Sequence, residues 1–300
     1  MYDLIIIGGG PAGLAAAVYA LRQHLNLLVI GDQIGGRVGW RLDVPWLENH
    51  HSLAGEDVVR TLKAEAHLRH LPRVLDRALQ IEAVDDHYRV RTAAELFEAR
   101  ALLIATGAYP TRLNVPGEET FYLRGISYSA ITYAAAMLDK TVAVIGDGPL
   151  ALRSTAELLR AAARVYLVAP DPACRTSPWG RRLATASHLT WLTGYQVTNI
   201  QGTEYAEELV VRGAHGVQTI KVDCIFVETG LQANSGVVAN LVQHDAQGRI
   251  IVDNRNRTSR PGIFAAGDVT DVYAEQILVA VGEGAKAALS VSEYLAELEP

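Results

Sequence analysis

The sequence is poor in cysteine, and this limits the thiol chemistry open to it. Only two of its 300 residues are cysteines, Cys174 and Cys224, and no C-x-x-C pair occurs. Cys224 lies in an apolar stretch that predicts a buried strand, and free cysteine is among the most buried residue types. We interpret both as small hydrophobic residues in a reducing cytosol, while a disulfide between them and a reactive Cys174 stay open as alternatives.

Basic runs and long apolar runs are also absent. The net charge is −6, which argues against a nucleic-acid partner. No apolar stretch reaches the ~18 residues of a transmembrane helix, and no basic region precedes the short apolar run at the N-terminus, so that run predicts a core strand rather than a signal peptide. We expect a cytoplasmic protein with no membrane partner. Its 300 residues suggest about two domains, and its 49% hydrophobic content supports sizeable cores.

What is present begins with a strand, a glycine-rich turn and a helix at the N-terminus. Residues 4–7 predict a buried strand, and the turn after them fits G-x-G-x-x-G. The first glycine permits the turn, the second lets a pyrophosphate approach the backbone, and the third lets the helix pack on the strand. Amides at the helix start then hold the phosphate charge. The predicted dinucleotide site comprises Gly8, Gly10, Pro11, Ala12 and Gly13.

Several segments after this helix also predict parts of a cofactor site. Residues 26–30 predict the second strand, and Asp32, after a glycine, is the only acid at its end that could bind a ribose hydroxyl. The irregular loop 35–51 would lie beyond the strand ends and carries Gly36, Arg37 and Asn49. A helix is predicted over 56–71, and strand patterns occur over 79–91 and 96–104 with a turn at residues 85–86. The last of these strands ends in Ala105, Thr106 and Gly107.

A second strand, glycine turn and helix begin at residue 141. Residues 141–145 predict the strand, 152–163 the helix and 164–168 the next strand. Two nucleotide-type folds in one chain are a far more specific signal than one. The residues of this turn are Gly146, Gly148, Pro149 and Leu150. Residues 209–212 and 218–227 predict two further strands.

Near the C-terminus, a further strand ends in Gly267-Asp268, and a helix is predicted from about residue 276 to 298. A carboxylate at this position can accept a hydrogen bond from a cofactor hydroxyl, and the helix start offers amides to a ring or phosphate. The alternative is that Asp268 caps the helix.

The segments 8–13, 105–108 and 262–269, in this order, resemble the flavoproteins with two dinucleotide-binding domains, and most closely low-molecular-weight thioredoxin reductase. The resemblance covers nearly the whole chain. It implies an α/β fold of two Rossmann-like (three-layer ββα) dinucleotide-binding domains, the second inserted in the first. Residues 1–113 and 242–300 would form an FAD-binding domain, and residues 116–239 an inserted NAD(P)-binding-like domain. The resemblance also implies a homodimer. By position, the three glycines of the first motif would hold the FAD pyrophosphate, Asn49 would lie near the flavin, Asp268 would bind the ribityl chain, and Gln276 and Ile277 would contact the ring edge.

The departures from that family are as informative as the matches. Its redox segment is Cys-Ala-Thr-Cys-Asp, where this sequence has Ser129-Ala130-Ile131-Thr132-Tyr133. Hydroxyls cannot replace thiols there, because thiol–disulfide exchange needs a thiolate of moderate pKa. Neither cysteine of this chain falls at a matching position. Classical thioredoxin reduction through this segment is therefore excluded.

The nucleotide-binding residues depart as well. The family's His-Arg-Arg, which grips the 2′-phosphate of NADPH, aligns with residues 169–171, and only Arg175 matches a more distant arginine. Asp171 would repel a phosphate but could suit the free 2′-hydroxyl of NADH. NADPH is therefore disfavoured and NADH stays open. The alternative is a middle domain that binds no nicotinamide, or a different ligand such as a second flavin.

Three residues of the loop 35–51 leave two interpretations each. Arg37 stands where relatives often carry Gln. It would either stabilise an anionic reduced flavin or be a surface arginine paired with an acid. His50 and His51 would either shuttle protons to the flavin or be merely solvated.

The sequence therefore predicts an FAD-dependent oxidoreductase of thioredoxin-reductase architecture without a dithiol. Its electrons would come from NADH or a ferredoxin-like protein and pass to an unknown acceptor. The alternative is a flavin-binding or redox-sensing protein without turnover. The sequence assigns no catalytic residue and no metal ligand.

Overall fold

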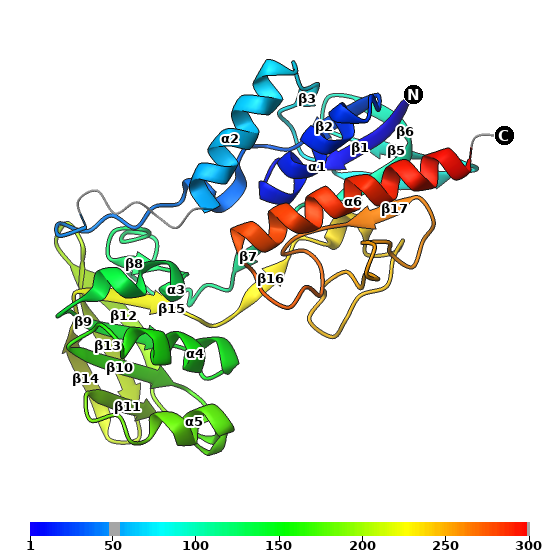
Figure 1. Cartoon of the computed structure of the whole chain (residues 1–300). Coiled ribbons are helices and arrows are strands. Elements are labelled where there is room, and N and C mark those ends of the chain that lie inside the picture. Colours follow the sequence, from blue (N-terminus) through cyan, green and yellow to red (C-terminus); the bar gives the residue numbers. More distant parts are fainter. Residues whose placement is uncertain (48–54, 299–300) are drawn as a thin grey trace. The chain divides into compact units, whose positions relative to one another are not determined.

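The computed structural model describes residues 1–47 and 55–298, which form two compact units (Figure 1). Of the described residues, unit 1 comprises 1–39, 55–109 and 232–298, and unit 2 comprises 40–47 and 110–231. The expected insertion of residues 116–239 differs from unit 2 at both ends. Residues 232–239 lie in unit 1 because Val238 and Val242 pack into its core. The segment after residue 39 belongs to unit 2 because Leu42 and Val44 are buried in its core.

Unit 1 is built on a seven-stranded sheet in the order β3-β2-β1-β6-β5-β4, with β17 also paired to β6. Its strands β1, β2, β3, β6 and β17 are paired in parallel, and the β4–β5 hairpin joins β6 antiparallel. The expected turn at residues 85–86 lies between β4 and β5. The bounds are β1 (Tyr2–Ile7), β2 (Leu27–Ile30), β3 (Arg73–Val74), β4 (Gln80–Val84), β5 (His87–Arg91), β6 (Leu96–Ile104) and β17 (Ile263–Ala265).

Helices cover one face of this sheet. Alternate residues of a strand point to opposite faces, so each strand contributes side chains to both sides of the sheet. Leu4 and Ile6 of β1 pack with α1, α2 and α6, whereas Ile5 and Ile7 pack on the other side against Val238 and Val269. In Figure 1, α6 (red) runs alongside α1 (dark blue). The helical segments are α1 (Pro11–Arg22), the short turn η1 (Gly36–Gly39), α2 (Gly55–Leu68), η4 (Gly236–Val238) and α6 (Ile277–Glu297).

Unit 2 has three layers. A five-stranded parallel sheet in the order β11-β10-β9-β15-β8 is covered on one face by helices and on the other by the antiparallel sheet β12-β13-β14. The strands are β8 (Ile126–Ser127), β9 (Thr141–Ile145), β10 (Arg164–Ala169), β11 (Leu189–Thr193), β12 (Gln196–Gly202), β13 (Ala206–Gly213), β14 (Gly216–Lys221) and β15 (Cys224–Val227). The helical segments are α3 (Ala130–Tyr133), η2 (Ala134–Met137), α4 (Pro149–Leu158), η3 (Pro172–Thr176) and α5 (Pro178–Leu183). A two-stranded ribbon of β7 (Ala108–Pro110) and β16 (Leu231–Ala233) lies where the chain passes between the units.

The α/β class with parallel sheets is confirmed, but two expected elements of unit 2 are wrong. Residues 218–227 were expected to form one strand, yet they form β14 and β15 in different sheets, because Val222 and Asp223 bond to Glu207 and Thr141 respectively. The helix expected over 152–163 begins at Pro149 and ends at Leu158. Proline is favoured in the first turn of a helix, where its missing N–H costs nothing.

Candidate functional site

The first candidate site surrounds the start of α1 in unit 1. A Cβ on Gly13 would lie 1.9 Å from the carbonyl oxygen of Gly8, and one on Gly8 would lie 2.2 Å from that of Ala105. Both glycines therefore allow close packing of the helix and two strand ends. A Cβ on Gly10 would meet only the Cα of Gly36, at 4.0 Å, so Gly10 faces open space. The α1 helix has no side-chain cap and no acid in its first turn, which suits an anion at its amides.

Other expected site residues gather at the same helix start. A Cβ on Gly36 would lie 3.0 Å from the Cα of Gly10, and one on Gly267 would lie 3.0 Å from the Cβ of Ala12. Both glycines have positive φ, +57° and +78°. Asn234 holds Thr106 and Gly107 in place. Its backbone oxygen accepts a hydrogen bond from the Thr106 hydroxyl at 2.7 Å, and its backbone N–H donates to the oxygen of Gly107 at 2.9 Å.

The start of α6 is another helix start of unit 1 without a side-chain cap. Gln276 is its N-cap residue in an extended conformation without a side-chain cap, and Ile277 is its first residue. The alternative role of Asp268 as the cap of this helix is therefore wrong. Two helix starts without side-chain caps and the open space at Gly10 fit FAD, which carries a pyrophosphate and an electron-rich ring. Gly8, Gly10, Pro11, Ala12 and Gly13 would hold the pyrophosphate, and Gln276 and Ile277 the ring edge.

Arg37 and Asp268 form an ion pair and hydrogen bond. Their side chains are 29% and 16% exposed. Burial raises the pKa of Asp268 above its usual value, while the Arg37 guanidinium acts in the opposite direction and Glu275 adds to the rise. Arg37 thus pairs with an acid, as one interpretation expected, and that acid is itself an expected cofactor residue.

Two further expected parts of this site are less informative. Asp32 is exposed, and its carboxylate forms an ion pair with Arg77 at 2.7 Å, so its role toward a ribose stays a prediction. Asn49, His50 and His51 lie outside the described residues.

The second candidate site lies in unit 2 at the carboxyl ends of its parallel strands. Gly146 has a φ of +143°, and a Cβ there would lie 2.5 Å from the carbonyl oxygen of Glu228. Gly148 has no atom within 4 Å of such a Cβ and is the N-cap of α4, without a side-chain cap. Pro149 and Leu150 begin the helix. This end of α4 therefore has the open start and free amides that a pyrophosphate requires.

Two carboxylates stand beside this helix start. Asp171 follows β10, its backbone N–H donates to Oδ2 of Asp147 at 2.9 Å, and its Oδ1 accepts from the N–H of Ala173 at 2.8 Å. Arg175 is exposed, with its guanidinium 5.3 Å from the ring centroid of Trp191. The sequence reasoning missed Asp147, although an acid inside a Gly-x-Gly turn was visible.

The segment at the start of α3 carries two hydroxyls on one turn. Ser129 Oγ and Thr132 Oγ1 are 2.8 Å apart and hydrogen-bonded. The backbone N–H of Ala130 donates to Oε1 of Glu228 at 2.7 Å, and Glu228 is only 4% exposed. The sequence reasoning also missed Glu228, a carboxylate directly after the apolar strand β15.

Both cysteines are unpaired and buried. Burial raises the pKa of the Cys174 thiol, and the charges of Asp147 and Asp171 add to the rise. Burial also raises the pKa of Cys224, which is fully buried in β15. The disulfide left open from the sequence is therefore wrong, and a reactive Cys174 is disfavoured because its thiolate is disfavoured.

Known proteins match nearly the whole chain. The family model described as pyridine nucleotide-disulphide oxidoreductase matches residues 2–284. The chain belongs to this family. The solved thioredoxin reductase from Streptococcus pyogenes shares 31% identity over 99% of both chains with a TM-score of 0.86, and that from Giardia duodenalis shares 26% over 98% of this chain and 99% of that one with a TM-score of 0.85.

Curated relatives of this pyridine nucleotide-disulphide oxidoreductase are longer than the chain itself. The F component of alkyl hydroperoxide reductase from Pseudomonas aeruginosa is 33% identical over 98% of this chain, and that from Staphylococcus aureus is 31% identical over 98%. The chain spans only 58% and 59% of their lengths. Membership identifies a flavin-dependent oxidoreductase and implies FAD and a nicotinamide cofactor. The resemblance to thioredoxin reductase expected from the motifs is confirmed.

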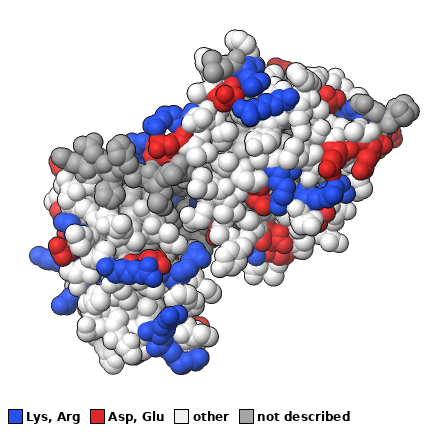
Figure 2. Space-filling model, in the orientation of Figure 1, with Lys and Arg blue, Asp and Glu red and all other residues white. Residues whose placement is uncertain are grey.

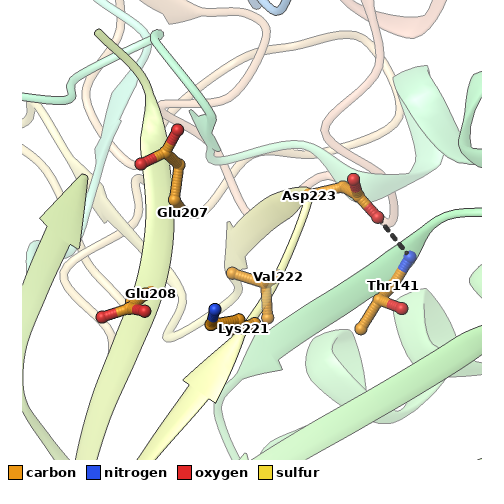
Figure 3. Close-up of a pocket in the computed structure, with 6 residues that line it drawn as sticks. All are labelled: Thr141, Glu207, Glu208, Lys221, Val222 and Asp223. Carbon is orange, nitrogen blue, oxygen red and sulfur yellow. Dashed lines mark hydrogen bonds between the residues drawn. The ribbon is translucent and has the colours of Figure 1, made fainter. Parts of the chain in front are cut away.

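Among the described residues, no helix is long and apolar enough to span a bilayer and no group of side chains is arranged to hold a metal. On the face in Figure 2, acidic and basic side chains lie close to one another. Figure 3 shows a hollow in unit 2 at the start of β9, the strand end opposite the nucleotide turn. Its lining residues are Thr141, Glu207, Glu208, Lys221, Val222 and Asp223.

Proposed function

We propose that the protein is an FAD-dependent oxidoreductase that passes electrons from NADH to an acceptor outside the chain without an internal dithiol. FAD would bind in unit 1 and NADH in unit 2. The proposal includes the homodimer that the resemblance implies, and a ferredoxin-like protein as the alternative donor.

The observation that carries this proposal is the hydroxyl pair of Ser129 and Thr132. These residues stand where the resemblance puts the redox cysteines, and a hydroxyl cannot form a disulfide. The two cysteines lie elsewhere, unpaired and buried. Electrons on the flavin therefore cannot pass to a dithiol at the position where the family carries one.

Each cofactor group has residues suited to it. When bound, FAD would supply an N5 atom that takes up a hydride and passes the electrons on. The start of α1 would bind the pyrophosphate, Asp268 would accept a hydrogen bond from the ribityl chain, and the start of α6 would place its positive dipole end at the ring.

The preference for NADH is supported by the acids beside α4. Asp147 and Asp171 are joined by a hydrogen bond at the ends of β9 and β10, where the ribose of a dinucleotide lies in this kind of fold. Carboxylates accept hydrogen bonds from ribose hydroxyls and repel a 2′-phosphate.

We expect NADH to reduce the FAD-loaded protein anaerobically, and NADPH to require at least ~10-fold higher concentration because of this repulsion. Asp171→Asn should lower the ratio of the NADPH to the NADH concentration needed by about 10-fold. Asp139→Asn, at an exposed acid elsewhere in unit 2, should leave this ratio unchanged. The measurement is the bleaching of the oxidised flavin's visible absorbance as each nicotinamide is added.

The donors give distinguishable results. If both nicotinamides leave the flavin oxidised while reduced ferredoxin bleaches it, the NADH assignment is wrong and the protein donor is correct. If no donor reduces it and artificial acceptors give no turnover, the oxidoreductase proposal fails in favour of a flavin-binding sensor.

A further inference from the structure

The Arg37–Asp268 pair joins two segments 231 positions apart in the sequence. The Arg37 segment is fixed to the start of α1, because Gly35 donates its N–H to the oxygen of Gly9 at 2.7 Å and Gly36 packs against Gly10. Asp268 is held by its neighbour Gly267, whose oxygen accepts both the N–H and the hydroxyl of Thr270, at 2.9 and 2.8 Å. Both ends of the ion pair are thus fixed by backbone contacts.

The pair lies among the elements that fit FAD. Gly36 lies close to Gly10 at the start of α1, and Gly267 packs closely against Ala12 of α1 and Ala280 of α6. Arg37 contacts Oδ2 of Asp268, and a carboxylate has acceptor sites for several more donors. Asp268 can therefore bind a cofactor hydroxyl while it remains paired with Arg37.

Opposing charges act on Asp268. Its carboxylate is 16% exposed, and burial disfavours its ionised form. The charged groups that act on it are Arg37, which lowers its pKa, and Glu275, which raises it. Without Arg37, only burial and the charge of Glu275 would remain, and both raise the pKa of Asp268.

We propose that Arg37 is a positioning residue for FAD, which keeps the Asp268 carboxylate ionised and oriented to accept a hydrogen bond from the cofactor. This inference rests on the proposed FAD site. The guanidinium acts through Asp268, not as a direct cofactor ligand. FAD affinity thereby stays constant to lower pH than the buried acid alone would allow.

The direction of the pH effect follows from this role. Protonation of Asp268 replaces an acceptor by a group that can donate, so FAD binding weakens as pH falls through the pKa of this acid. Removing Arg37 raises that pKa further, so the weakening must begin at higher pH. At alkaline pH, Asp268 is ionised with or without Arg37, and the difference between the variants must shrink.

The experiment is a titration of apoprotein with FAD, followed by flavin fluorescence from acid to alkaline pH. We expect Arg37→Gln to weaken binding about 10-fold at neutral pH and to move the pH midpoint of the loss upward, and Arg37→Lys to restore part of both. In an Asp268→Asn background, Arg37→Gln should change the affinity less than ~3-fold. The matched control is Arg89→Gln, which removes an arginine paired with Glu98 at 3.0 Å in the same unit.

Each result supports or overturns the inference. An unchanged pH profile in Arg37→Gln overturns it, and so does a full loss of affinity in the Asp268→Asn background, since Arg37 would then act on FAD directly. Arg37→Gln that only lowers thermal stability, as a structural role would, also contradicts it. If the unaltered protein binds no FAD at any pH, the proposed function itself has failed.

Discussion

The double variant S129C/T132C is expected to form an intramolecular disulfide in the FAD-loaded protein. The hydroxyl oxygens are already 2.8 Å apart on one turn, and sulfurs on longer C–S bonds can close to the ~2.05 Å of a disulfide. Residue 129 is the N-cap of α3, where a thiolate is stabilised by the helix start. The measurement is the intact mass before and after reduction with alkylation.

The same variant should gain a second redox centre. We expect its anaerobic reduction to consume about twice the electrons of the unaltered protein, because a disulfide takes up two electrons. The single variants S129C and T132C are the controls and should behave like the unaltered protein. A double variant whose thiols stay reduced under mild oxidant, although it is folded, contradicts the assignment of this turn to the former dithiol position.

Gly10→Val is expected to abolish FAD binding while leaving the fold intact. Its backbone φ of −74° suits any residue, and its side chain would enter the open space by the start of α1. That space is the proposed pyrophosphate path, so we expect a loss of at least ~100-fold, equivalent to one or two hydrogen bonds to a charged group. Fluorescence titration with FAD measures it, together with the thermal melting of the apoprotein.

Two other glycines serve as matched comparisons. Gly13→Ala should lower the free energy of unfolding by about 3 kcal/mol, because its Cβ would lie 1.9 Å from the Gly8 oxygen. Gly282→Ala, in α6 with no atom near the added Cβ, should leave FAD binding unchanged and raise the free energy of unfolding by about 0.5–1 kcal/mol, because alanine favours a helix interior over glycine. If Gly10→Val binds FAD like the unaltered protein, FAD does not pass this helix start.

The sequence was most informative where local pattern determines the structure. The glycine motif joins β1 to α1 as expected: Gly8 and Gly13 allow close packing, and Gly10 leaves open space at the helix start. The start of α6 at Ile277 was likewise predictable, because an apolar helical pattern follows a Gly-Asp turn.

The features that could not be predicted from the sequence depend on contacts between residues far apart in the chain. Arg37 finds Asp268 only after folding, so the pattern left two roles for the arginine. Leu42 and Val44 lie within the loop 35–51 that was expected at the cofactor site, yet they pack in the core of unit 2, which no local periodicity predicts. The break between β14 and β15 depends on hydrogen bonds to Glu207 and Thr141, both distant in the sequence.

The most direct test of the account is an anaerobic dithionite titration of the FAD-loaded protein. A flavin without a dithiol relay should be fully reduced by one two-electron equivalent per bound FAD. A requirement for two such equivalents, with a charge-transfer band after the first, would reveal a redox-active disulfide and contradict the account.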